Sequence, residues 1–251
     1  MFVRASVELV WMKPKTRLER AAWLHRFCAR ALQALDVRVD VEGQFPAGGA
    51  VIVNHRSYLD IVVLAAIHPC VFVSKSEVSA MPVVGWMTTM SGTVYVERGR
   101  GGSALTAGKG VQEAANDGLP VVFFPEGTTN TGAELLKFHS GLLGQVMLER
   151  MPIQMGYLRY RLDGPNAPGV TVEQDVCWGT TPLLTHVFRV LGLRGLRAEV
   201  RFADEPIAFS ENAANRKIAA EEARAAMARL GDEDGRETTV AGLLPQKLHC
   251  L

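Results

Sequence analysis

Short apolar runs alternate with amphipathic stretches along most of the chain. Runs rich in Val, Ile and Phe have the length and composition of β-strands, and they occupy residues 37–42, 50–53, 71–74, 93–97, 120–125 and 152–158. Helical patterns separate them, at residues 57–67, 81–90, 103–117 and around 141–150. The inner runs are continuously apolar, as expected where helices cover both faces of a mostly parallel sheet. The pattern predicts an α/β fold with a mostly parallel central sheet covered by helices.

The N-terminal stretch 16–35 has the periodicity of an amphipathic helix. Phe27 lies among its apolar side chains, arginines occupy other parts of the helical wheel, and Trp23 lies near one border. Such a helix either packs on its own domain or lies in a membrane interface, where Lys and Arg meet lipid phosphates. We therefore divide the chain into an N-terminal helical segment, residues 1–35, and an α/β domain, residues 36–251.

The C-terminal third of the chain is less regular. It contains two further β-rich runs, 170–176 and 197–202, and a long Ala/Glu/Arg helix over residues 212–230. Residues 181–197 are apolar and include three arginines. This stretch fits a second membrane-contacting segment or a helix packed on the sheet.

Composition narrows the function classes. A chain of 251 residues with 48% hydrophobic and 21% charged residues suits one sizeable globular domain. The net charge of +1 provides no basic field for nucleic acid. The four cysteines have no CxxC spacing, which argues against a zinc ribbon or a disulfide framework. No apolar run reaches the ~18–20 residues that cross a bilayer, and we see no secretory signal at the N-terminus.

His55 and Asp60 follow the strand-like run 50–53. In an open α/β sheet, ligands bind beyond the carboxyl ends of the strands, which is where this histidine lies. Imidazole is the usual general base near neutral pH, and a carboxylate partner fixes its tautomer. A structural interpretation competes with this one, because Ser57 and Asp60 form an S-x-x-D pattern that resembles a capping box.

A second polar segment follows the run 120–125. Gly127 permits a tight turn after Glu126, and the hydroxyls and amides that follow could hold an anion. The same residues also suit a plain Pro/Gly turn. Arg98 follows another strand, and its planar guanidinium can grip a phosphate with two hydrogen bonds.

Other hydrolytic and metal-dependent sites lack their motifs. No serine lies in a GxSxG elbow. No HEXXH motif is present, and the histidines are widely spread. The sequence therefore predicts no metal site and no serine nucleophile.

Four motifs occur in an order that is highly specific. They are N-H-x-x-x-x-D from Asn54 to Asp60, G-x-x-x-x-x-R from Gly92 to Arg98, F-P-E-G-T beginning at Phe124, and Met-Pro-Ile at 151–153. Together they resemble the glycerolipid acyltransferase family, the PlsC-type 1-acylglycerol-3-phosphate acyltransferases. The similarity spans roughly residues 35–205, most of the chain.

The resemblance implies a function and a set of site residues. The enzyme would transfer a fatty acyl chain from acyl-CoA or acyl-carrier protein to the sn-2 hydroxyl of lysophosphatidic acid, giving phosphatidic acid, without a cofactor or metal. His55 would deprotonate that hydroxyl and Asp60 would orient His55. Residues implied in acceptor binding are Arg98 at the phosphate, Glu126, Gly127 and Thr128 around the glycerol, and Lys137 as a further cation.

The fourth motif departs from the family pattern, which commonly reads V-P-I-V-P-V. Here the strand reads M-P-I-Q-M-G over 151–156, so Gln154 and Tyr157 could meet a different head group. One alternative is therefore an acyltransferase for lyso-ornithine lipid or another lysolipid. An alternative of another class is a non-catalytic membrane lipid-binding protein, in which the His55/Asp60 pair would have no use.

The resemblance also implies a location and partners. The protein would bind membrane lipids from the cytoplasmic face of the bacterial inner membrane, as a peripheral, monotopic protein. It implies no nucleic acid, and the sequence predicts no oligomeric state. The N-terminal segment would dock on the membrane, with residues 181–197 as a second candidate.

Overall fold

The computed structural model describes residues 14–80, 84–97, 103–132 and 134–232. Within these ranges, seven strands form one sheet in the order β1-β7-β6-β2-β5-β3-β4. The strands are β1 (Arg38–Glu42), β2 (Ala50–Val53), β3 (Val71–Lys75), β4 (Val94–Val96), β5 (Val121–Phe123), β6 (Ile153–Leu162) and β7 (Leu196–Phe202). Each pair is parallel except β6 and β7, which run antiparallel. The predicted α/β fold with a mostly parallel sheet is confirmed.

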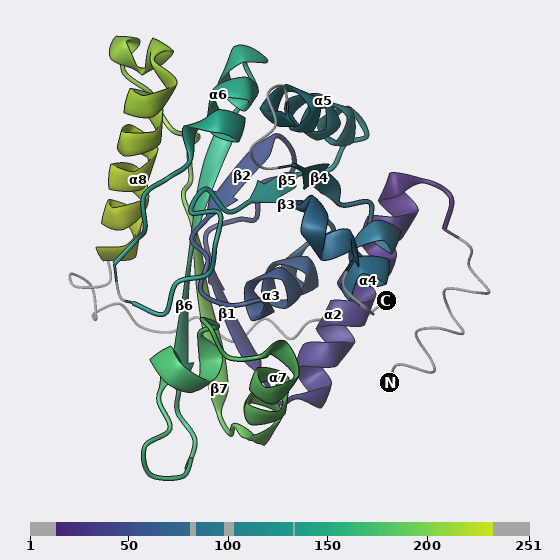
Figure 1. Cartoon of the computed structure of the whole chain (residues 1–251), viewed down its shortest axis with the longest axis vertical. Coiled ribbons are helices and arrows are strands. Elements are labelled where there is room, and N and C mark those ends of the chain that lie inside the picture. Colours follow the sequence, from purple (N-terminus) through teal and green to yellow (C-terminus); the bar gives the residue numbers. More distant parts are fainter. Residues whose placement is uncertain (1–13, 81–83, 98–102, 133, 233–251) are drawn as a thin grey trace.

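Helices cover both faces of the sheet (Figure 1). They are α2 (Arg17–Ala34), α3 (Leu59–Ile67), α4 (Val84–Met90), α5 (Ser103–Asn116), α6 (Ser140–Leu148), α7 (Leu183–Gly192) and α8 (Arg216–Asp232). The short helical turns are η1 (Ser76–Ala80), η2 (Val172–Val176) and η3 (Glu211–Ala214). One hydrophobic cluster joins α2, α3 and α7 to the sheet, and a second joins α5, α6 and α8 to its other face.

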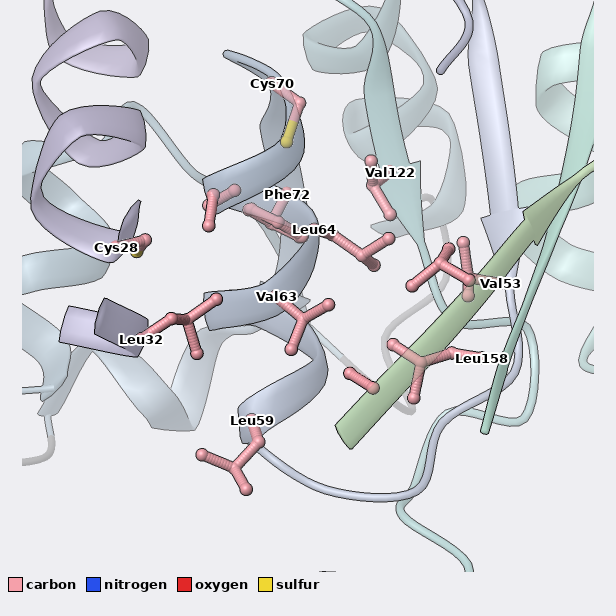
Figure 2. Close-up of a cluster of buried hydrophobic side chains, with 14 of the residues drawn as sticks. Cys28, Leu32, Val53, Leu59, Val63, Leu64, Cys70, Phe72, Val122 and Leu158 are labelled. Carbon is pink, nitrogen blue, oxygen red and sulfur yellow. The ribbon is translucent and has the colours of Figure 1, made fainter. Parts of the chain in front are cut away.

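Helix α2 packs with its aromatic residues inward. Thr16 caps its first turn, because the hydroxyl accepts from the Glu19 amide while the Glu19 carboxylate reaches back to the Thr16 amide. Trp23 and Phe27 are buried in the cluster shared with α3, and neighbouring α2 and α3 side chains such as Leu32 and Leu59 are drawn in Figure 2. Trp23 therefore belongs to the core, not to the border of the apolar face. Membrane docking by residues 1–35 stays a prediction, and residues 1–13 lie outside the described ranges.

Two C-terminal segments differ from their sequence patterns. The β-rich run 170–176 forms the single helical turn η2, because the Thr171 hydroxyl accepts from the Gln174 amide and so caps a turn. Strand β6 continues to Leu162, four residues beyond the predicted run, because it pairs with β7 along that length. The run 197–202 does form strand β7.

The described cysteines are buried and form no disulfide. Cys28, Cys70 and Cys177 are free thiols, and burial raises the pKa of Cys28 to about 12. A buried neutral thiol is a poor nucleophile. These cysteines therefore act as small apolar core residues.

Candidate active site

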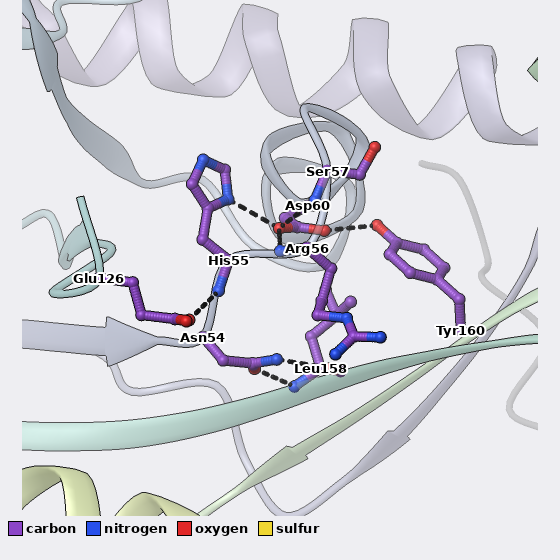
Figure 3. A network of polar contacts seen from close by, with 8 residues as sticks. All are labelled: Asn54, His55, Arg56, Ser57, Asp60, Glu126, Leu158 and Tyr160. Atoms are coloured by element: carbon purple, nitrogen blue, oxygen red, sulfur yellow. Dashed lines mark hydrogen bonds and ion pairs between the residues drawn. The ribbon is translucent and has the colours of Figure 1, made fainter. Parts of the chain in front are cut away.

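The site begins where β2 ends at Val53. The Asn54 side chain continues the ladder between β2 and β6: its amide donates to the Leu158 carbonyl at 2.9 Å, and its oxygen accepts from the Leu158 amide at 2.7 Å. Asn54 is buried and both of its side-chain groups are satisfied. This clamp fixes the point at which the chain leaves the sheet toward His55 (Figure 3).

His55 and Asp60 form the predicted pair. His55 Nδ1 lies 2.8 Å from Asp60 Oδ2, and the same oxygen accepts from the Arg56 amide at 2.7 Å and the Ser57 amide at 3.0 Å. Because this carboxylate oxygen only accepts, Nδ1 is the protonated ring nitrogen and Nε2 is the one able to take a proton. Among the described residues, Nε2 has no hydrogen-bond partner.

The capping interpretation of Ser57 and Asp60 is half correct. Asp60 reaches back to the Ser57 amide, as in a capping box. The Ser57 hydroxyl, however, is buried and has no hydrogen-bond partner in the described part of the chain. One carboxylate thus orders the loop before α3 and orients the histidine.

Tyr160 completes the surroundings of the carboxylate. Its hydroxyl, from strand β6, donates to Asp60 Oδ1 at 2.7 Å (Figure 3). Burial, and then the neighbouring Asp60 carboxylate, raise the pKa of Tyr160 well above its ordinary value, so the phenol stays protonated. Asp60 is fully buried, and these hydrogen bonds replace the water that it loses. No sequence motif marked Tyr160, which lies 100 residues from its partner.

The segment after β5 holds the other side of His55. The Phe124 ring stacks on the imidazole, with centroids 3.9 Å apart and planes 11° apart. Glu126 Oε1 accepts from the His55 amide at 2.8 Å, and Oε2 accepts from the Leu136 amide at 2.8 Å. Burial raises the pKa of Glu126, although these amides act in the opposite direction. In the structure the Glu126 carboxylate thus holds the backbone of the loop that carries His55. Contact of Glu126 with the glycerol of the acceptor stays a prediction.

Of the other predicted acceptor-binding residues, the structure describes Gly127, Thr128 and Lys137 but not Arg98. Gly127 turns the chain directly after Glu126 with φ +67°, in the left-handed region that favours glycine, and the exposed Thr128 follows. Lys137 is exposed and adjoins Leu136, the residue bound by Glu126. Arg98 lies outside the described residues. Binding of acceptor by Arg98, Thr128 and Lys137 stays a prediction.

Tyr157 lies away from this site. Residues 158 and 160 of β6 face the α3 side, whereas Tyr157 packs in the other cluster, against Gly231 of α8. Tyr157 and Tyr160 therefore lie on opposite faces of β6, because neighbouring residues of a strand point to opposite faces. Contact of Tyr157 with a head group stays a prediction.

In the described ranges, no group of three or more His, Cys, Asp or Glu side chains could hold a metal ion. None of the described helices combines the length and apolar character needed to cross a membrane.

Comparisons with known proteins gave matches in sequence. The acyltransferase family model matches residues 36–155. The lyso-ornithine lipid O-acyltransferase of Pseudomonas aeruginosa is 36% identical over 71% of this chain and 65% of that protein. The protein of the same description from Rhodobacter capsulatus is 30% identical over 77% of this chain and 70% of that protein. The 1-acyl-sn-glycerol-3-phosphate acyltransferase of Neisseria gonorrhoeae is 30% identical over 68% of this chain and 67% of that protein.

A solved structure shares the fold. The crystal structure of the 1-acyl-sn-glycerophosphate (LPA) acyltransferase, PlsC, from Thermotoga maritima matches 89% of this chain and 83% of that chain with a TM-score of 0.60. The sequence identity is 18%. This likeness shows the same arrangement of helices around the mixed sheet.

Proposed function

We propose that this chain, which belongs to the acyltransferase family, transfers a fatty acyl chain to the free hydroxyl of a lysolipid. The observation that carries the proposal is the His55–Asp60 pair at 2.8 Å, with Nε2 left open for a substrate. A general base must be oriented and must face the proton that it removes. A protein that only binds lipid has no use for such a pair.

The proposed reaction is a direct transfer. Nε2 of His55 takes the proton of the acceptor hydroxyl while that oxygen attacks the thioester carbonyl carbon of acyl-CoA or acyl-carrier protein. The tetrahedral intermediate collapses, the carbon–sulfur bond breaks, and the imidazolium returns its proton to the leaving thiolate. Asp60 stabilises the imidazolium through Nδ1. The step needs no acyl-enzyme, no cofactor and no metal.

Lysophosphatidic acid is the acceptor that we propose first. Its phosphate suits Arg98, with Lys137 as a second cation and with Gly127 and Thr128 around the glycerol. The second motif, from Gly92 to Arg98, supports this assignment.

Lyso-ornithine lipid is the second candidate. It is favoured by the Pseudomonas and Rhodobacter relatives, at 36% and 30% identity, which carry that substrate in their names. The departure of the fourth motif at Gln154 supports the same alternative. Either acceptor is a membrane lipid, so we also propose that the protein works as a peripheral protein on the cytoplasmic face of the bacterial inner membrane.

The test is acyl transfer from labelled acyl-CoA by the purified full-length protein in detergent, with the two lysolipids offered side by side. His55→Gln is the control, because it keeps the size of the side chain and removes the base. General bases contribute roughly 10²–10⁴-fold, so the variant should lose at least 99% of the activity on the preferred acceptor. Preference for the ornithine lipid would move the head-group assignment from Arg98 to Gln154.

If neither lipid is acylated, the alternative of a non-catalytic lipid-binding protein has to be tested. If acyl-carrier protein also fails as donor, and wild type and His55→Gln bind lysolipid equally well, the protein is a lipid-binding protein and not an enzyme. Activity retained in His55→Gln would instead overturn the assignment of the base.

A further inference from the structure

Helix α7 exposes a concentrated apolar face. Leu184 and Phe188 are each 73% exposed and Leu191 is 53% exposed. Their spacing of four and then three residues places them on one side of the helix. The other large hydrophobic residues that are exposed in the described ranges are single residues on separate elements. Isolated exposed leucines need no explanation, whereas a patch does.

The inward face of α7 contains a buried histidine next to an apolar residue. His186 is fully buried and Val190 is nearly so, while leucine and phenylalanine lie outside. His186 Nε2 lies 3.1 Å from the Cys177 carbonyl, and Nδ1 lies 3.2 Å from the Tyr58 hydroxyl. Both ring nitrogens are therefore satisfied. These contacts hold the helix with its apolar face turned to the outside.

Charge identifies what covers this face. The sequence from residue 176 to 198 contains no Asp or Glu, and three arginines. Arg197 pairs with Asp163 at 2.6 Å. Arg189 and Arg194 are exposed, and neither has an acidic partner among the described residues. An apolar face bordered by unpaired cations suits an anionic membrane surface, where leucine and phenylalanine enter the acyl boundary and arginine meets phosphate.

The helix adjoins the catalytic loop. Tyr58, three residues from His55, contacts His186 edge-to-face with ring centroids 5.5 Å apart. The Trp178 amide donates to the Arg56 carbonyl at 2.8 Å. Helices α7, α3 and α2 lie on the same face of the sheet (Figure 1). A surface that binds α7 therefore lies close to the loop that carries the base.

We propose that α7 docks on an anionic lipid bilayer through Leu184, Phe188 and Leu191, with Arg189 and Arg194 at the lipid phosphates. This deepens the proposed function, on which it rests only for the lipid nature of the acceptor. Docking brings the catalytic loop to the bilayer surface, where a lysolipid presents its hydroxyl. The site then receives its acceptor without the lipid leaving the membrane.

The apolar contribution is tested by vesicle co-sedimentation of the full chain on phosphatidylglycerol vesicles. Leu184→Ser/Leu191→Ser should bind at least tenfold more weakly, which corresponds to ~1.4 kcal/mol. The matched control is Leu105→Ser/Leu148→Ser, on helices of the other face, where the leucines are 49% and 74% exposed. The control should bind within twofold of wild type. Phe188→Ser is a second, single test if the double variant does not fold by circular dichroism.

The electrostatic contribution is tested with Arg189→Gln/Arg194→Gln against Lys109→Gln/Lys217→Gln, which removes two exposed cations from α5 and α8. The arginine variant should lose the preference for phosphatidylglycerol over phosphatidylcholine, and the lysine variant should keep it. Equal binding of both leucine variants would overturn the proposal. Loss of a dimer by Leu184→Ser/Leu191→Ser in light scattering, with vesicle binding unchanged, would overturn it in favour of self-association.

Activity separates this proposal from the proposed function. Leu184→Ser/Leu191→Ser should acylate a detergent-dispersed lysolipid at the wild-type rate and lose activity on the same lipid in vesicles. Loss on both would mean that α7 serves the reaction itself and not docking, and would overturn the inference. Because binding is measured without turnover, a chain that binds vesicles and transfers nothing would contradict only the proposed function.

Discussion

Tyr160→Phe is the most informative single change in the site. It removes one oxygen and leaves the ring, so the packing of the ring in the cluster shared with α2, α3 and α7 is kept. The lost hydroxyl donates to Asp60 Oδ1 at 2.7 Å. Asp60 is fully buried, and no other donor to Oδ1 is present in the described part of the chain. One oxygen of a buried carboxylate is then left without a partner.

The expected size of the effect follows from this geometry. Hydrogen bonds to charged groups contribute ~1.5–3 kcal/mol, so the free energy of unfolding should fall by that amount. For a chain of this size the melting temperature would fall by roughly 3–12 °C. The three donors to Oδ2 remain, and His55 keeps most of its orientation. If about 1 kcal/mol of the loss falls on the transition state, kcat decreases roughly fivefold.

Urea unfolding and steady-state kinetics measure the two effects. The KM of the acceptor should not change, because Tyr160 is buried behind Asp60 and does not reach the substrate. Tyr157→Phe is the control on the same strand, since no described residue bonds to its hydroxyl, and its stability should stay within ~0.5 kcal/mol. A double-mutant cycle with Asp60→Asn should give a coupling of about 1 kcal/mol or more.

Two results would refute this reasoning. If Tyr160→Phe unfolds within ~0.5 kcal/mol of wild type, the hydroxyl is not the partner on which the carboxylate depends. If KM rises while kcat is unchanged, Tyr160 acts on acceptor binding and not through Asp60. A structural role alone would lower stability without lowering kcat.

Two further predictions concern Glu126 and His186. Glu126→Gln replaces an acceptor with a donor that faces the amide of His55 or Leu136, so the free energy of unfolding should fall by ~1–3 kcal/mol. The kcat should also fall, with the acceptor KM unchanged. A raised KM alone would instead support contact between Glu126 and the glycerol. Burial lowers the pKa of His186, so the unfolded chain binds a proton that the folded chain excludes, and stability should fall as pH drops below ~6.5. His186→Gln should reduce that slope between pH 7.5 and 5 in urea titrations, and equal slopes would contradict the prediction.

The His55–Asp60 pair could be predicted because its geometry is local. The two residues are five apart, and α3 begins at Leu59, so Asp60 lies in the first turn beside the strand end. A chain segment of only five residues can place its two end residues in few relative positions. The strand-like runs were predictable for a related reason, because a strand buried on both faces must be apolar throughout.

The orientation of amphipathic helices was not predictable. The periodicity of α2 is the same whether its apolar face meets lipid or α3, and the structure buries Trp23 in the protein core. In α7 the periodicity has the opposite outcome, since His186 lies inside and Phe188 outside. A hydrophobic pattern shows which side of a helix is apolar. Whether protein or lipid covers that side depends on the elements packed around the helix.

Tyr160 shows how a non-local partner enters the site. Asn54 clamps Leu158 by two hydrogen bonds and thereby fixes the register of β6 against the end of β2. Side chains repeat on one face of a strand every second residue, so Tyr160 lies on the same face as Leu158 and reaches Asp60. A register slip of one residue would turn Tyr160 to the opposite face. The asparagine of the N-H-x-x-x-x-D motif therefore sets the strand register that supplies Asp60 with its last donor.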